Sequence, residues 1–187
     1  MSKRSVKGPV LHLGLAIVVA ALTSAAVATS GVQTVRMEDN CDPATFNAVL
    51  GDGACQRDEG TTFDQFLANT AAEGGDHHWR YKEDEFQVRT GEAVNAFNLG
   101  GEAHTFTPVA NFGGGFVDVL NDLSGAGPIV PECVPVANAA GDLVAPGPVP
   151  IAVGHSSQPQ VLKGTRLQRF QCCIHPWMRA EVTVRNR

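Results

Sequence analysis

Three side chains with metal-binding chemistry stand at intervals of three residues near the C-terminus. Cys172, His175 and Met178 offer a thiolate, an imidazole and a thioether. They fall on a tight connection between two segments that alternate like strands, so all three side chains can turn toward a common point. Sulfur and imidazole ligands together suit copper, and the spacing therefore predicts a metal site on this loop.

A trigonal copper site needs two imidazoles and one thiolate, with a weak axial thioether, so a second histidine must come from elsewhere in the fold. His104 is the candidate. It lies in the strand-like segment 102–107, whose alternation places His104 and Phe106 on the same, inward face. We expect the fold to bring this segment to the C-terminal loop.

Two stretches of the chain resemble the small blue copper proteins, or cupredoxins, and most closely their amicyanin and plastocyanin branch. Residues 172–178, Cys-x-x-His-x-x-Met with a proline after the histidine, are similar to the short ligand loop of amicyanins. Residues 98–106, with a glycine-containing turn before the histidine, are similar to the strand of the first ligand. The resemblance implies a Greek-key β-sandwich and one type 1 copper ion, with four ligands: His104 and His175 as equatorial nitrogens, Cys172 as the thiolate and Met178 as the axial sulfur.

Two adjacent cysteines leave a choice of thiolate, because Cys173 and Ile174 stand where amicyanin-like loops usually have threonine and proline. Cys172 lies three residues before His175 and shares a strand face with Phe170. Cys173 points to the opposite side of the strand. Cys172 is therefore the predicted ligand.

The chain has five cysteines, an odd number. In an oxidising compartment most of them pair, and one thiol is left over. With Cys172 on the metal, the other four allow three pairings. We prefer Cys41–Cys55, which would bracket a short helix, together with Cys133–Cys173.

Residues 1–28 have the pattern of a secretory signal peptide. A basic start is followed by the apolar run Leu13–Leu22 and by Ala26-Val27-Ala28, a small-x-small cleavage pattern. Cleavage predicts a periplasmic or secreted protein with no membrane insertion, and it removes three of 14 basic residues, leaving 11 against 19 acidic ones, a formal charge of −8. An uncleaved anchor is the alternative, because the apolar segment approaches the length that spans a bilayer.

Residues 29–75 are predicted to be a small helical extension. Asp42 is the expected N-cap of a first helix, with proline in the first turn. The apolar face of this helix consists of Phe46, Val49 and Leu50. A second helix can begin at Thr62, whose spacing to Gln65 fits a capping box.

From residue 76 to residue 187, apolar and polar residues alternate with the period of strands. Pairs that share a strand face are Trp79 and Tyr81, Phe86 and Val88, Phe97 and Leu99, Phe170 and Cys172, and Val182 and Val184. Glycine-rich turns separate the segments, and the stretch 125–154 is rich in loops. We therefore predict an all-β, antiparallel, cupredoxin-like sandwich domain over 76–187.

Several other polar residues are predicted to form ordinary surface. His77 and His78 could bind a second metal, but a solvated pair is expected at the entrance to the sandwich domain. His155 falls in a loop rich in glycine, serine and proline. Asp76 belongs with residues 83–85 to an acidic cluster, interpreted as a solvated face that could steer a basic partner.

Composition and motifs argue against other functions. The acidic balance gives no sign of nucleic-acid binding. A c-type haem would need Cys-x-x-Cys-His, and the hydrolase motifs HExxH and GxSxG are missing from the sequence. Zinc is disfavoured, because the usual second cysteine or histidine pair is lacking and methionine is a poor zinc ligand.

We therefore expect a one-electron carrier and not an enzyme. By the resemblance, a transient redox partner docks near His175 and Trp177, and the electron passes through the exposed edge of His175. A hydrogen bond from the backbone near Thr105 to the Cys172 sulfur is expected to tune the site. The alternative is a cell-envelope protein that binds or delivers copper, which the scarcity of spare copper ligands disfavours.

Overall fold

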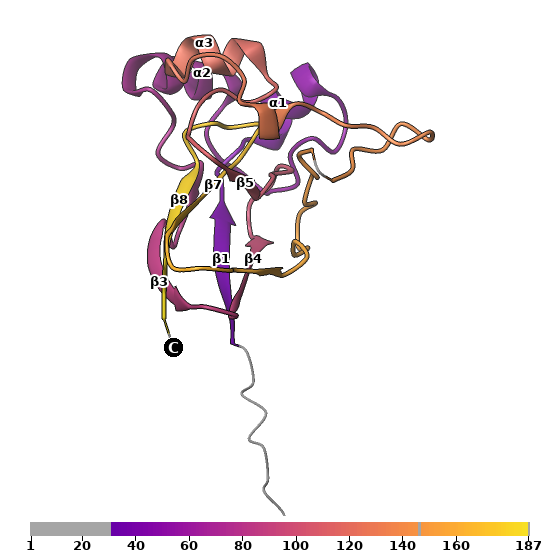
Figure 1. The fold of residues 1–187 in the computed structure, drawn as a ribbon. Helices are drawn as coiled ribbons and strands as arrows, with labels where there is room; N and C mark the ends of the chain where they lie inside the picture. Colours follow the sequence, from indigo (N-terminus) through magenta and orange to yellow (C-terminus); the bar gives the residue numbers. More distant parts are fainter. Residues whose placement is uncertain (1–30, 146, 187) are drawn as a thin grey trace, which may run out of the picture.

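The structure, a computed structural model, describes residues 31–145 and 147–186, and the predicted signal segment lies outside them. Two four-stranded sheets form the body, and short helices gather at one end of the strands (Figure 1). Across the described ranges no helix is long and apolar enough to span a bilayer.

Each sheet mixes parallel and antiparallel pairs. The first sheet, in the order β2-β1-β4-β6, consists of β1 (Val32–Glu38), β2 (Arg80–Tyr81), β4 (Ala93–Asn98) and β6 (Gln160–Val161). The second sheet, in the order β3-β8-β7-β5, consists of β3 (Glu85–Arg89), β5 (Thr107–Val109), β7 (Leu167–Gln171) and β8 (Arg179–Arg185). The pairs β1–β4 and β3–β8 are parallel and the other pairs are antiparallel. The prediction of a purely antiparallel sandwich is therefore wrong.

Side chains from both sheets belong to one hydrophobic core. Tyr81 of β2 lies edge-on against Phe106, with ring centroids 5.5 Å apart. Phe106 in turn stacks on Phe170 of β7 at 4.3 Å. Because these rings connect one sheet to the other, the sheets form the two layers of a sandwich.

The strand β1 was not predicted, and its presence makes the segment 29–75 more than a helical extension. β1 runs parallel to β4 from the pair of Val32 with Ala93 to the pair of Met37 with Asn98. Its residues Val35 and Met37 are fully buried in the core. The segment therefore contributes a central strand to the first sheet.

Phe97 and Leu99 share a face, as predicted, and it is the outer face of the first sheet. Ala96 and Asn98 point into the core, whereas Phe97 is half-buried and Leu99 is exposed. A shift of one residue exchanges the two faces of a strand, and the larger apolar side chains of this segment lie on the outer face.

The two predicted helices are present, with the predicted caps. In α1 (Pro43–Leu50), the Asp42 carboxylate accepts a hydrogen bond from the amide of Thr45. In α2 (Phe63–Glu73), Thr62 and Gln65 form the reciprocal capping box. The helix α3 (Asp118–Ser124) and a 3-10 turn over Pro131–Cys133 were not predicted.

Two disulfides join Cys41 to Cys55 and Cys133 to Cys173, as preferred from the sequence. Cys172 is the one free thiol among the five cysteines, all of which lie in the described residues, and it is buried. Directly after β7, Cys172 packs in the main core and Cys173 packs in a separate small apolar cluster. The expectation that the two neighbouring thiols point to opposite faces is confirmed.

The helix α1 packs through a narrow face. Phe46 is fully buried and stacks on Trp79 at 5.8 Å, with Phe63 at 5.1 Å and Phe66 at 5.5 Å. Val49, by contrast, is 60% exposed, so the predicted apolar face is wrong beyond Phe46. Leu50 is also exposed. Phe46 is the one buried residue among the eight of α1.

We predict that Phe46→Ala lowers the free energy of unfolding by about 3–5 kcal/mol, because it removes a buried aromatic ring and leaves a cavity. Val49→Ala on the exposed side of the same helix should change it by less than about 0.5 kcal/mol. Chemical denaturation followed by tryptophan fluorescence measures both. Equal effects of the two substitutions would contradict the packing of α1.

Candidate metal centre

Two loops at the helical end of the sandwich bring three of the predicted ligands together. His104 lies in a short bridge to Ile151, with backbone hydrogen bonds of 3.2 and 2.7 Å. Cys172 follows β7, and the chain returns to β8 through a loop closed by two hydrogen bonds. The amide of Cys172 donates to the carbonyl of Met178 (3.0 Å), and the amide of Met178 donates to the carbonyl of His175 (2.9 Å). The predicted tight connection between two strands is therefore confirmed.

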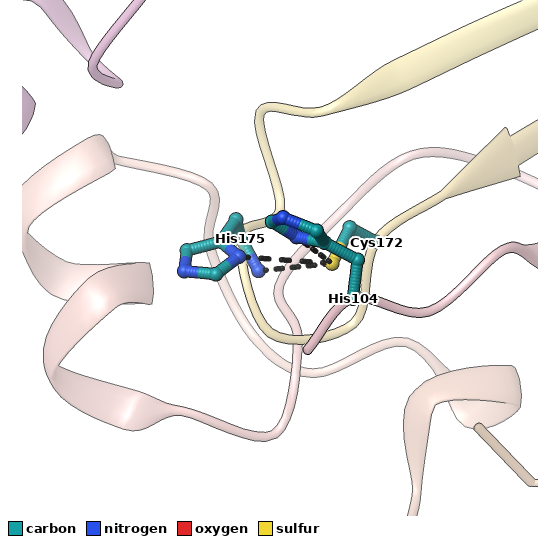
Figure 2. Close-up of side chains that lie close together, drawn as sticks. All are labelled: His104, Cys172 and His175. Carbon is teal, nitrogen blue, oxygen red and sulfur yellow. Dashed lines mark hydrogen bonds between the residues drawn. The ribbon is translucent and has the colours of Figure 1, made fainter. Parts of the chain in front are cut away.

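The sulfur of Cys172 faces the imidazole rings of both His104 and His175 (Figure 2). The Nδ1 atoms of the rings lie 3.9 and 3.8 Å from the sulfur, and the three donor atoms lie within 4.8 Å of one another. All three residues are at most 2% exposed. The structure thus encloses a nitrogen, nitrogen and sulfur donor set in the protein interior.

These distances fit a single metal ion. Bonds of about 2.0 Å to nitrogen and about 2.3 Å to sulfur, at an angle of about 120°, would place the two donor atoms about 3.7 Å apart. The observed separations of 3.8 and 3.9 Å are close to this value. Two imidazoles and one thiolate around one point are the donors of a trigonal copper site.

The environment of Cys172 favours the thiolate. The amides of Thr105 and His175 point at the sulfur from 3.4 and 3.5 Å. Burial raises the pKa of the thiol, but hydrogen bonds from the rings of His104 and His175 and their charge outweigh burial and hold the pKa well below its ordinary value. The amide of Thr105 is the backbone donor expected from the sequence.

Met178 ends the same loop and is buried in the main core. The backbone bonds that close the loop fix its main chain directly after the turn that carries His175. Its role as an axial ligand stays a prediction.

Asp39, which directly follows β1, holds the ring of His104. Its Oδ2 atom lies 2.8 Å from Nε2 of His104, and both side chains are fully buried. The amides of Gly101 and Glu102 donate to the same carboxylate from 2.8 and 2.9 Å. Because a carboxylate only accepts, Nε2 of His104 is the protonated nitrogen, and this leaves Nδ1 for a metal.

Asp39 and His104 shift each other's pKa in opposite directions. Burial alone would raise the pKa of Asp39, but the contact with His104 and the backbone amides lower it to about 2. Burial alone would lower the pKa of His104, but Asp39 and the Cys172 sulfur raise it to about 10. A carboxylate behind the ring thus stabilises positive charge at the imidazole.

Glu102 stands behind the second ring in the same way. Its carboxylate accepts a 2.6 Å hydrogen bond from the indole of Trp79 and lies 3.7 Å from Nε2 of His175. The pKa of Glu102 is raised, because the effect of burial exceeds the lowering by the charge of His175 and by the hydrogen bond from Trp79. Each imidazole therefore has Nδ1 toward the sulfur and Nε2 toward a buried carboxylate.

The glycine pair before His104 is required by close approach. A Cβ atom on Gly100 would collide with the Asp39 carboxylate, and one on Gly101 would lie 2.7 Å from the sulfur of Cys41. The absence of side chains at this turn therefore lets Asp39 reach His104.

His175 is covered by aromatic side chains, so the predicted exposed edge is wrong. Its residue is only 2% exposed. Phe66 of α2 meets the ring edge-on at 6.0 Å, Trp177 lies at 5.6 Å and Trp79 at 6.4 Å. The helix α2 thus packs against the end of the sandwich that holds His175, and Phe66 shields the ring from solvent.

Sequence reasoning missed Asp39 and Glu102. Glu102 had a local signal, because it lies two residues before His104 and therefore on the same face of an extended segment. Asp39 had none, because it is 65 residues away from its partner in the sequence.

No protein-family profile and no curated protein sequence matches the chain. Among solved structures, the chain is similar to a purple cupredoxin from Nitrosopumilus maritimus, with 14% identity, a TM-score of 0.36, and coverage of 59% of this chain and 86% of that one. It is also similar to amicyanin from Paracoccus versutus, with 15% identity, a TM-score of 0.34, and coverage of 57% and 73%. These neighbours are cupredoxins.

We predict that Asp39→Asn weakens the binding of Cu²⁺ by about 10- to 100-fold, because it removes the charge that orients His104. Asp58→Asn, on the exposed surface, is the control and should bind as the wild type does. Competition with a chelator of known affinity measures both. Unchanged affinity in Asp39→Asn would show that this carboxylate does not support the site.

Proposed function

We propose that the protein is a one-electron carrier that holds one type 1 copper ion. His104, Cys172 and His175 would be its strong ligands, with Met178 as a weak fourth ligand from the same loop. The observation that carries the proposal is the convergence of two imidazole nitrogens and one sulfur on a single buried point. This donor set is the one that blue-copper electron-transfer sites use.

Copper would supply the redox chemistry, since it is stable in both the +1 and +2 states. The side chains of the site contribute rigidity. His104 is held by Asp39 from behind, the Cys172 sulfur by two amides, and the loop by its own backbone hydrogen bonds. Donors fixed in this way move little when the charge at the site changes, which favours fast electron transfer.

Burial supports a relay over the alternative of copper delivery. A delivery protein exchanges its metal with a partner, and exchange requires ligands that the partner can reach. His104 and Cys172 are fully buried, and His175 lies beneath Phe66 and Trp177. The same enclosure disfavours an enzyme, because a substrate would need access to the ion.

We place the docking of a redox partner at Trp177 and the surface around it. Trp177 is half-buried, and its ring lies 5.6 Å from the covered ring of His175. The acidic balance of the chain favours a partner with a basic surface, because complementary charge speeds encounter. Export to the periplasm or the cell exterior, expected from residues 1–28, belongs to the same proposal.

We predict that the protein loaded with Cu²⁺ is intensely blue, with a thiolate-to-copper band at about 600 nm. Cys172→Ser should lose the band, because a hydroxyl cannot replace the thiolate. His155→Gln, at an exposed histidine outside the site, should keep it. Absorption and EPR spectra measure the three proteins. Copper binding to the wild type without the blue band would contradict the proposal.

We predict a reversible one-electron couple whose reduction potential rises in Glu102→Gln. The buried carboxylate beside His175 favours the higher charge state at the site, and the substitution removes this preference while keeping an acceptor for Trp79. Glu85→Gln, at an exposed position, is the control. Protein-film voltammetry measures the potentials. A lower or unchanged potential in Glu102→Gln would refute this electrostatic role.

A further inference from the structure

A second cluster of donor atoms lies next to Trp177, outside the buried site. Asp76, His77 and His78 each offer one ligand atom, and these atoms lie within 4.8 Å of one another. The indole of Trp177 donates to the carbonyl of Asp76 at 3.1 Å. Its ring lies 5.6 Å from the ring of His175, so Trp177 contacts both places.

Asp76 does not belong to a solvated face, so the interpretation made from the sequence is wrong for this residue. The residue is fully buried. Its Oδ2 accepts a 2.7 Å hydrogen bond from the side chain of Asn69, and its Oδ1 accepts a 2.9 Å bond from the amide of His78. The carboxylate is therefore held in one orientation beside the two histidines before any ion arrives.

The spacing of the donors suits a metal ion. Nδ1 of His78 lies 2.9 Å from Oδ1 of Asp76. Two ligands at about 2.1 Å from one ion, at an angle of about 90–110°, would be about 3.0–3.4 Å apart. An ion would take the place of the proton that these two atoms now share, with little movement of either side chain.

The histidines make the cluster accessible. The side chains of His77 and His78 are 65% and 42% exposed, and their rings lie 4.0 Å apart. The carboxylate of Glu73, at the end of α2, lies 3.8 Å from Nδ1 of His77 and brings a second negative charge. The cluster thus combines one buried carboxylate with two imidazoles that face solvent.

We propose that Asp76, His77 and His78 form a second, solvent-accessible site for a divalent transition-metal ion, with Cu²⁺ preferred over Zn²⁺. Imidazole and carboxylate ligands suit both ions, and Cu²⁺ binds such sites more tightly. This site is independent of the proposed electron-carrier function. With no thiolate among its donors, it should bind copper without the blue band, and it should exchange the ion faster than the buried site does.

Isothermal titration with Cu²⁺ and EPR test the proposal on the full-length protein. The wild type should bind two equivalents, of which the second gives a nitrogen and oxygen type of copper spectrum. The double variant His77→Gln with His78→Gln should lose the second equivalent, with affinity reduced by more than about 100-fold. His155→Gln, which removes an exposed histidine outside the cluster, should retain it.

The experiments test the two sites independently. Cys172→Ser should abolish the blue band and leave the surface equivalent in place, so a wrong assignment of the buried site does not affect this result. The proposal is overturned if the wild type lacks the additional equivalent, if the double variant retains it, or if His155→Gln removes it. Zn²⁺ titration should give the same pattern with weaker affinity.

Discussion

The structure depends on how two imidazole rings are held between one sulfur and two buried carboxylates. Nδ1 of each ring faces Cys172, while Nε2 faces Asp39 in one case and Glu102 in the other. Carboxylates this deep are costly to bury without partners. Here backbone amides and the Trp79 indole supply those partners, so the arrangement fixes which nitrogen of each ring is available for a metal.

The N-terminal segment contributes as much to this arrangement as the two ligand loops do. β1 lies beside β4 and ends directly before Asp39, and α2 brings Phe66 over His175. The Cys41–Cys55 disulfide brackets α1 between these two elements. A segment that reads as an appendage in the sequence thus completes one side of the site and closes its end.

Patterns that act over short distances along the chain were predictable. The caps of α1 and α2 and the opposite directions of Cys172 and Cys173 follow from local spacing. The amide donor near Thr105 lies 67 residues from Cys172 and came from the copper-site hypothesis, not from local spacing. The strand β1, the parallel pairing and the contact of Asp39 with His104 depend on residues far apart in sequence, for which one sequence carries no signal. The cover over His175 was missed for the same reason, since the docking of α2 is a tertiary contact.

The adjacency of Cys172 and Cys173 has a consequence for maturation of the chain. Cys133 must be oxidised with Cys173 and not with its neighbour, although the two thiols differ by only one position. Because the two side chains point to opposite sides of the chain, a disulfide to Cys172 would draw its sulfur away from His104 and His175. Correct pairing of Cys133 with Cys173 therefore keeps the Cys172 thiol free beside the two imidazoles, and thiol–disulfide exchange is the chemistry that can repair an error there.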